Sequence, residues 1–203
     1  MKKISVLNRL ILVGAGHVAG YQIVAGIEGL DSLPTLAYTI AFGVMVLACL
    51  LTLTLGYRAL ENTGIVIVAT LIPLGLSTGM VLEYSPGFAP VYLLLAIAGF
   101  VLVVGTKLLR PGPAANITVT IVHGLAGLIV SILPVGLSLR GVKPPAFALV
   151  GAGGFLVGVM GMMLALERFG KPLVGRERIY RVLPTLLLLT NALFVLGMRA
   201  VRP

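Results

Sequence analysis

Charged residues are scarce in this chain, and they are absent from the centres of its apolar segments. Only 10% of the 203 residues are charged, against 59% hydrophobic residues and a mean hydropathy of +1.12. A soluble globule of this size needs more polar surface, so the composition predicts a protein solvated by lipid. Without a carboxylate or a lysine in mid-segment, paired-carboxylate catalysis, an acidic proton relay and a retinal Schiff base are excluded.

Other residues that would indicate a chemistry are missing as well. The single cysteine, Cys49, excludes an internal disulfide and a thiolate metal cluster. There is no HExxH, no GxSxG and no phosphate-cradling glycine loop, and the GAGG at 151–154 follows no strand, which indicates a helix-packing surface. We therefore predict no catalytic residues, and a role in an enzyme only as a non-catalytic subunit of an oxidoreductase.

Seven apolar runs are long enough to cross roughly 30 Å of hydrocarbon. They are continuously apolar, without the alternation of a membrane barrel, and short segments rich in proline, glycine and charge separate them. We predict an all-α, polytopic integral membrane protein, a single domain over residues 1–203. Its seven transmembrane helices lie at about 5–27, 36–57, 63–83, 88–109, 115–138, 146–166 and 180–199.

Lysine and arginine indicate the orientation of these helices. With the N-terminus in the cytoplasm, eleven basic residues lie inside and four lie outside, which is a positive-inside bias. We predict a multi-pass protein of the cell (plasma) membrane with its C-terminus outside and with Glu28, Asp31 and Glu83 on the outer face. The basic residues behind the net charge of +9 sit at the ends of the apolar runs, where they orient the helices in the membrane. We therefore expect no nucleic-acid partner.

The spacing of prolines indicates an internal repeat. Pro34 and Pro73 are 39 residues apart, as are Pro145 and Pro184, and at the same offset of 111 Gly43 falls on Gly154. Residues of about 5–83 would form one copy and about 115–199 the other, with a linker helix at about 88–109 between them. Four helices separate the copies, so the copies share one orientation, related by an axis along the membrane normal.

This 3+1+3 layout resembles the architecture of the sugar-transporting SWEET proteins. The resemblance is to layout alone, because the Pro-Gln dipeptide of the PQ-loop relatives is absent. It implies no functional residue for this chain.

The two histidines, His17 and His123, are the only candidate chemistry in the spans. They lie roughly 18 and 12 Å from the cytoplasmic side and would occupy equivalent helices of the two copies. Small residues lie three or four positions away on the same helix faces. These are Gly14 and Gly20 around His17, with Tyr21 beside them, and Thr120, Ala126 and Gly127 around His123.

Three interpretations of this pair are open. Each imidazole could hydrogen-bond a neighbouring helix, with the small residues allowing close packing. The pair could instead be the axial ligands of a b-type haem, and iron would then satisfy one nitrogen of each ring in lipid. Lastly, a histidine could bind or gate a solute at the repeat interface. Chlorophyll-type ligation is a further, more remote option.

Two amides complete the candidate site. Gln22 and Asn191 are costly to leave unpaired in lipid, so we expect both to face the bundle interior, with Asn191 the better placed to touch a ligand.

The chain has no tryptophan and so has few side chains that anchor it at the membrane interface, which favours partner subunits. The leading hypothesis is a membrane subunit of a redox assembly, with one haem b between His17 and His123 and electrons exchanged with a quinone or a partner. The alternatives are a small-solute transporter and a purely structural subunit.

Overall fold

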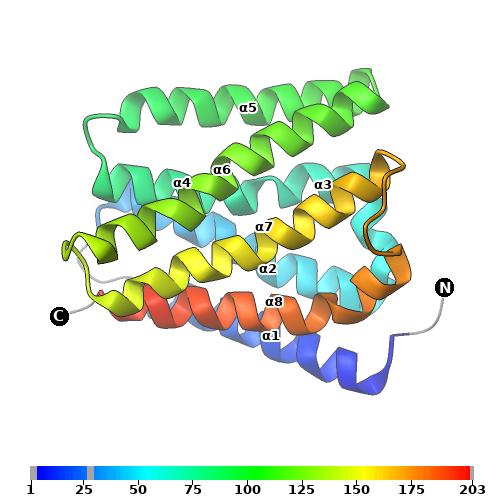
Figure 1. The fold of residues 1–203 in the computed structure, drawn as a ribbon, viewed down its shortest axis with the longest axis horizontal. Coiled ribbons are helices and arrows are strands. Elements are labelled where there is room, and N and C mark those ends of the chain that lie inside the picture. Colours follow the sequence, from blue (N-terminus) through cyan, green and yellow to red (C-terminus); the bar gives the residue numbers. More distant parts are fainter. Residues whose placement is uncertain (1–3, 27–29, 202–203) are drawn as a thin grey trace.

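The computed structural model describes residues 4–26 and 30–201, and within these ranges it is helical with no strand. Seven rods run roughly parallel or antiparallel (Figure 1). They are α1 (Val6–Ala25), α2 (Ser32–Leu55), α3 (Thr63–Ala69) with α4 (Leu71–Tyr84), α5 (Ala89–Leu109), α6 (Pro113–Leu139), α7 (Ala148–Arg168) and α8 (Arg176–Arg199). Two 3₁₀ turns, η1 (Tyr57–Glu61) and η2 (Pro145–Phe147), join neighbouring rods.

The all-helical fold is therefore confirmed. Six of the described rods are long and apolar enough to span a membrane. The first rod, α1, lies outside that set, and its sequence carries Asn8, Arg9, His17 and Gln22 among 20 residues.

Local chemistry sets several helix ends. The hydroxyl of Ser5 accepts a hydrogen bond from the Asn8 amide at the start of α1, and the side chain of Asn62 does the same for Gly64 and Ile65 at the start of α3. The break between α3 and α4 falls at Thr70, three residues before Pro73. Pro73 has no N–H to give to the Ala69 carbonyl, and its ring crowds that carbonyl, so the helix is interrupted there.

Six rods form a closed ring, in which each rod packs against the next. The order is α1, α2, α4, α6, α7, α8 and back to α1, while α5 lies outside the ring against α4 and α6. The ring is filled with apolar side chains from all six rods, among them Ala19, Phe42, Met80, Val130 and Phe194. A second apolar cluster, which includes Leu74, Tyr92 and Ala126, fixes α5 to the ring.

Glycines allow the tightest helix contacts. A Cβ atom on Gly151 of α7 would lie 2.5 Å from the Ser131 carbonyl oxygen of α6, and one on Gly154 would lie 2.9 Å from the Ser131 hydroxyl. On the other side of the ring, a Cβ on Gly75 of α4 would lie 2.6 Å from the Ala37 carbonyl oxygen of α2. The segment 151–154 is therefore a helix-packing surface.

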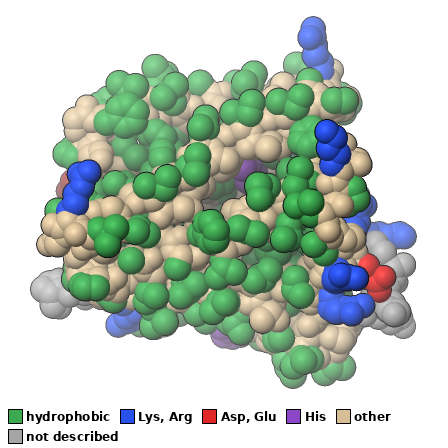
Figure 2. All heavy atoms as spheres, in the orientation of Figure 1, with side chains coloured by type: hydrophobic (Ala, Val, Ile, Leu, Met, Phe, Trp, Pro, Cys, Tyr) green, Lys and Arg blue, Asp and Glu red, His purple; other side chains and the backbone are tan. Residues whose placement is uncertain are grey.

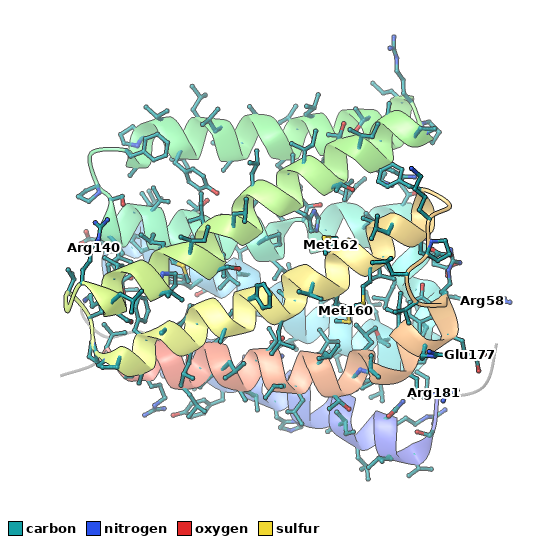
Figure 3. All side chains as sticks on the ribbon, in the orientation of Figure 1. Arg58, Arg140, Met160, Met162, Glu177 and Arg181 are labelled. Atoms are coloured by element: carbon teal, nitrogen blue, oxygen red, sulfur yellow. The ribbon has the colours of Figure 1, made fainter. Side chains whose placement is uncertain are left out.

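The surface matches a lipid environment. Apolar side chains cover the flanks of the rods, and lysine and arginine gather at the two ends of the bundle (Figure 2). Arg58, Glu177 and Arg181 lie at one end, where α1 begins, and Arg140 lies at the other (Figure 3). Glu28 lies outside the described residues, as do Lys2, Lys3 and Arg202.

Candidate functional site

His17 lies on the outer flank of α1. Its side chain is exposed, within a stripe that also contains Leu10, Val13, Tyr21 and Val24. The ring Nδ1 lies 2.8 Å from the Val13 carbonyl oxygen. A carbonyl oxygen can only accept, so Nδ1 carries the hydrogen and the neutral ring has its lone pair on Nε2. His17 thus presents an acceptor nitrogen on a lipid-facing surface.

His123 is half-buried on α6. Its Nδ1 lies 3.2 Å from the Val119 carbonyl oxygen, the same bond to the residue four positions earlier that His17 makes. The two imidazoles therefore share a local geometry but differ in exposure.

The structure does not bring the two histidines together. α1 packs against α2 and α8, whereas α6 packs against α4, α5 and α7. On the face shown in Figure 2, histidine side chains are visible at two separate places. The two histidines therefore lie on helices with different neighbours in the ring. Among the described residues no three His, Cys, Asp or Glu side chains gather to hold a metal ion.

The candidate glycines have other neighbours. A Cβ on Gly14 would lie 3.7 Å from Leu188 of α8, and one on Gly20 would lie 3.9 Å from Val46 of α2. These two glycines therefore face adjacent helices. Gly127 has open space within 4 Å of a Cβ, and its carbonyl accepts the Ser131 hydroxyl at 2.8 Å.

Gln22 and Asn191 lie in the interior, 3% and 1% exposed. The side-chain amide of Asn191 donates to the Ala15 carbonyl oxygen at 2.9 Å and so joins α8 to α1. The Gln22 amide nitrogen donates to the Gly26 carbonyl at 3.3 Å. The side-chain oxygens of both residues, and the Thr190 hydroxyl, are buried without a hydrogen-bond partner in the described part of the chain.

A polar cluster at the end where α1 begins was not anticipated. Arg176 binds Glu167 through two nitrogens, at 2.9 and 2.8 Å, and Glu61 through a third at 3.0 Å. The Tyr180 hydroxyl also donates to Glu61, and its ring stacks on that of Tyr57 at 5.3 Å. Glu61 and Arg176 are 115 residues apart, so no local pattern indicates the contact. The one available signal is opposite charge at the ends of neighbouring spans.

The described residues form an all-helical bundle in which six helices are long and apolar enough to span a membrane. No protein-family model matches the chain, and comparison with curated proteins and with solved structures finds no match either. The function must therefore be argued from the residues themselves.

Proposed function

We propose that the chain is a membrane subunit of a redox assembly, in which His17 supplies one axial ligand of a b-type haem at a boundary with another subunit. The observation that carries this proposal is the outward-facing imidazole of His17 on α1. When bound, the haem would supply one-electron exchange with a quinone or with a partner subunit.

The chemistry of His17 supports this role. A ligating histidine commonly donates its second ring N–H to a carbonyl, which fixes the tautomer and the ring orientation, and Val13 accepts such a bond here. An acceptor nitrogen in hydrocarbon is costly unless something binds it. Because His123 lies on a helix that packs elsewhere in the ring, we place the second axial ligand on a different chain.

The proposal includes the placement in the membrane. We place all seven rods across the plasma membrane with the N-terminus in the cytoplasm. The distribution of charge supports this orientation, since the bounds of the helices put eight described basic residues at the end where α1 begins and three at the other. The eight are Arg9, Arg58, Lys107, Arg110, Lys171, Arg176, Arg178 and Arg181, and the three are Arg140, Lys143 and Arg199.

The ring is also compatible with the internal repeat. A twofold axis along the membrane normal would map α1, α2 and α4 onto α6, α7 and α8, and the two contacts between copies, α1 with α8 and α6 with α4, would exchange. α5 is then the linker outside the ring. One matched pair differs in environment, because Gly154 packs against Ser131 whereas Gly43 has open space around a Cβ.

A difference spectrum tests the redox role. The protein is purified from its own membranes in a mild detergent that retains partner chains, and its reduced-minus-oxidised spectrum is recorded. We expect the bands of a six-coordinate b-type haem, lost in His17→Ala and retained in the matched control His123→Ala. Loss of the bands in both variants would show that His17 and His123 of one chain ligate the same haem. A colourless protein from cells with adequate haem would refute the redox role.

A small-solute transporter is the second candidate function. It is favoured by one observation, the closed six-helix ring with Asn191 in its interior. Solute flux into proteoliposomes that falls in Asn191→Ala would support transport. If the protein shows that flux and no haem bands in its difference spectrum, the transporter is the better assignment.

A further inference from the structure

Three buried side-chain atoms without a partner gather on one helix pair. They are Oε1 of Gln22 on α1, and Oγ1 of Thr190 and Oδ1 of Asn191 on α8, which packs against α1. We call these three residues the polar seam. All are at most 3% exposed. A buried polar atom left without a partner costs about 1–3 kcal/mol, so an atom of this kind normally binds a protein group or an ordered water.

The upper part of the polar seam adjoins a cavity near the C-terminal end of α1. Gln22, Thr35, Tyr38, Thr39 and Phe42 are among the residues that line it. The cavity offers about 20 Å³ to the centre of a water molecule. A space of about 10–15 Å³ by this measure is enough for one water, provided that polar partners are available. The amide oxygen of Gln22 and the hydroxyl oxygens of the threonines and the tyrosine can supply those partners.

The lower part lies in the middle of the bundle. Asn191 bonds to the carbonyl of Ala15, which is seven residues before Gln22, so this level is about 10 Å below the cavity along α1. Thr190 offers a hydroxyl hydrogen and Asn191 offers an oxygen lone pair. A water that reached both atoms would accept from the first and donate to the second.

Two aromatic rings separate the levels. Phe42 lines the cavity, and its ring meets that of Phe194 edge-on, with 6.5 Å between centroids. Phe194 follows Asn191 by three residues on α8 and so stands one turn closer to the cavity end.

We propose that the polar seam binds water at both levels, and that water reaches Thr190 and Asn191 from the cavity past Phe42. The seam would be a hydrated entry into mid-membrane from the end of the bundle at which α1 terminates. This inference does not depend on a haem, because it rests on α1–α8 packing and on the cavity.

Radiolytic hydroxyl labelling of the unmodified protein tests the upper level. X-rays split bound water into hydroxyl radicals that oxidise the nearest side chains, and peptide mass spectrometry measures the rate. Phe42 and Phe147 are a matched pair, 1% and 2% exposed, and only Phe42 lines the cavity. We expect Phe42 to be oxidised several-fold faster. Equal rates would overturn the inference at this level.

An isosteric substitution tests the lower level by the sign of its effect. Thr190→Val removes a hydroxyl, and the control Thr52→Val removes an equally buried hydroxyl that bonds its own helix at the Ala48 carbonyl, 2.7 Å away. If water binds Thr190, the variant loses that bond and should unfold about 2–4 °C below the unmodified protein in a detergent melt, as the control should. If Thr190 is dry, valine removes an unpaired polar atom, and a melting temperature equal to or above that of the unmodified protein would overturn the inference.

Discussion

Asn191 joins the last described helix to the first, because its amide nitrogen lies 2.9 Å from the Ala15 carbonyl oxygen across 176 residues of sequence. Both residues are fully buried, so this bond closes the six-helix ring at its interior rather than at its rim.

Removing this contact should loosen the α1–α8 interface. Asn191→Leu keeps the branched shape of the side chain, although leucine is larger, and takes the donor away from Ala15. We expect a loss of about 0.5–1.5 kcal/mol of stability for the lost bond, and more if the larger side chain overpacks the interior. Unfolding in detergent by a graded denaturant measures it. The control is Thr54→Val, an exposed hydroxyl on α2 bonded to the Leu50 carbonyl of its own helix, which should change little. A stabilised Asn191→Leu protein would show that the bond is not a net gain.

A methyl group on Gly151 should force α6 and α7 apart. In Gly151→Ala the new Cβ would meet the Ser131 carbonyl at 2.5 Å and Val135 at 2.6 Å, and overpacking of this kind costs about 1–3 kcal/mol. Gly158→Ala lies two turns along the same helix with open space around it, so it should be neutral or slightly stabilising. Thermal melts of both variants in one detergent make the comparison, and equal melting temperatures would contradict the observed packing.

The Arg176 cluster should contribute modestly and in a salt-dependent way. The side chains of Arg176 and Glu61 are 45% and 40% exposed, and exposed ion pairs contribute about 0–1 kcal/mol. Arg176→Gln should lower the melting temperature slightly at low salt, with the difference shrinking at 1 M salt as charges are screened. Arg178→Gln, an exposed neighbour on α8, is the control. An effect of Arg176→Gln that persists at high salt would assign the cluster a packing role instead.

Accessibility of single cysteines should report the orientation. Ser32→Cys and Arg140→Cys are exposed at the end where α1 terminates, and Lys171→Cys is exposed at the opposite end. We expect an impermeant thiol reagent added to intact cells to modify the first two and to spare the third. The native Cys49 is 3% exposed, so the unmodified chain supplies the background. The reverse pattern would invert the topology.

The sequence predicts the rods well because their signals are local. Each is an apolar run bounded by residues such as Pro113 or Gly170 that start or stop a helix, and the observed helices differ from the predicted ranges by a few residues at each end. The sequence predicts the number of membrane spans less well than the rods themselves. α1 carries Asn8, Arg9, His17 and Gln22, so whether it crosses the bilayer depends on the helices packed against it.

The arrangement of the site could not be obtained in this way. Sequence position gives the depth of His17 and His123 along a rod, but the direction in which each faces depends on which rods are adjacent. Close contacts at Gly75 and Gly151 help to set that order, and their partners lie on other helices. The sequence left the role of the glycines around His17 open, whereas in the structure Gly14 and Gly20 bring α1 against α8 and α2.

The closed ring also constrains the order of assembly. α1 is synthesised first among the described helices, and its two neighbours in the ring are α2 and α8. α2 is synthesised directly after α1, whereas α8 is synthesised after all the other described helices. Until α8 inserts, the flank of α1 that carries Gly14 and Ala15 has only lipid or a chaperone against it. Completion of the bundle is therefore a late, single docking event. A nascent chain stopped before α8 would expose the uncovered face of α1 to the quality-control machinery of the membrane.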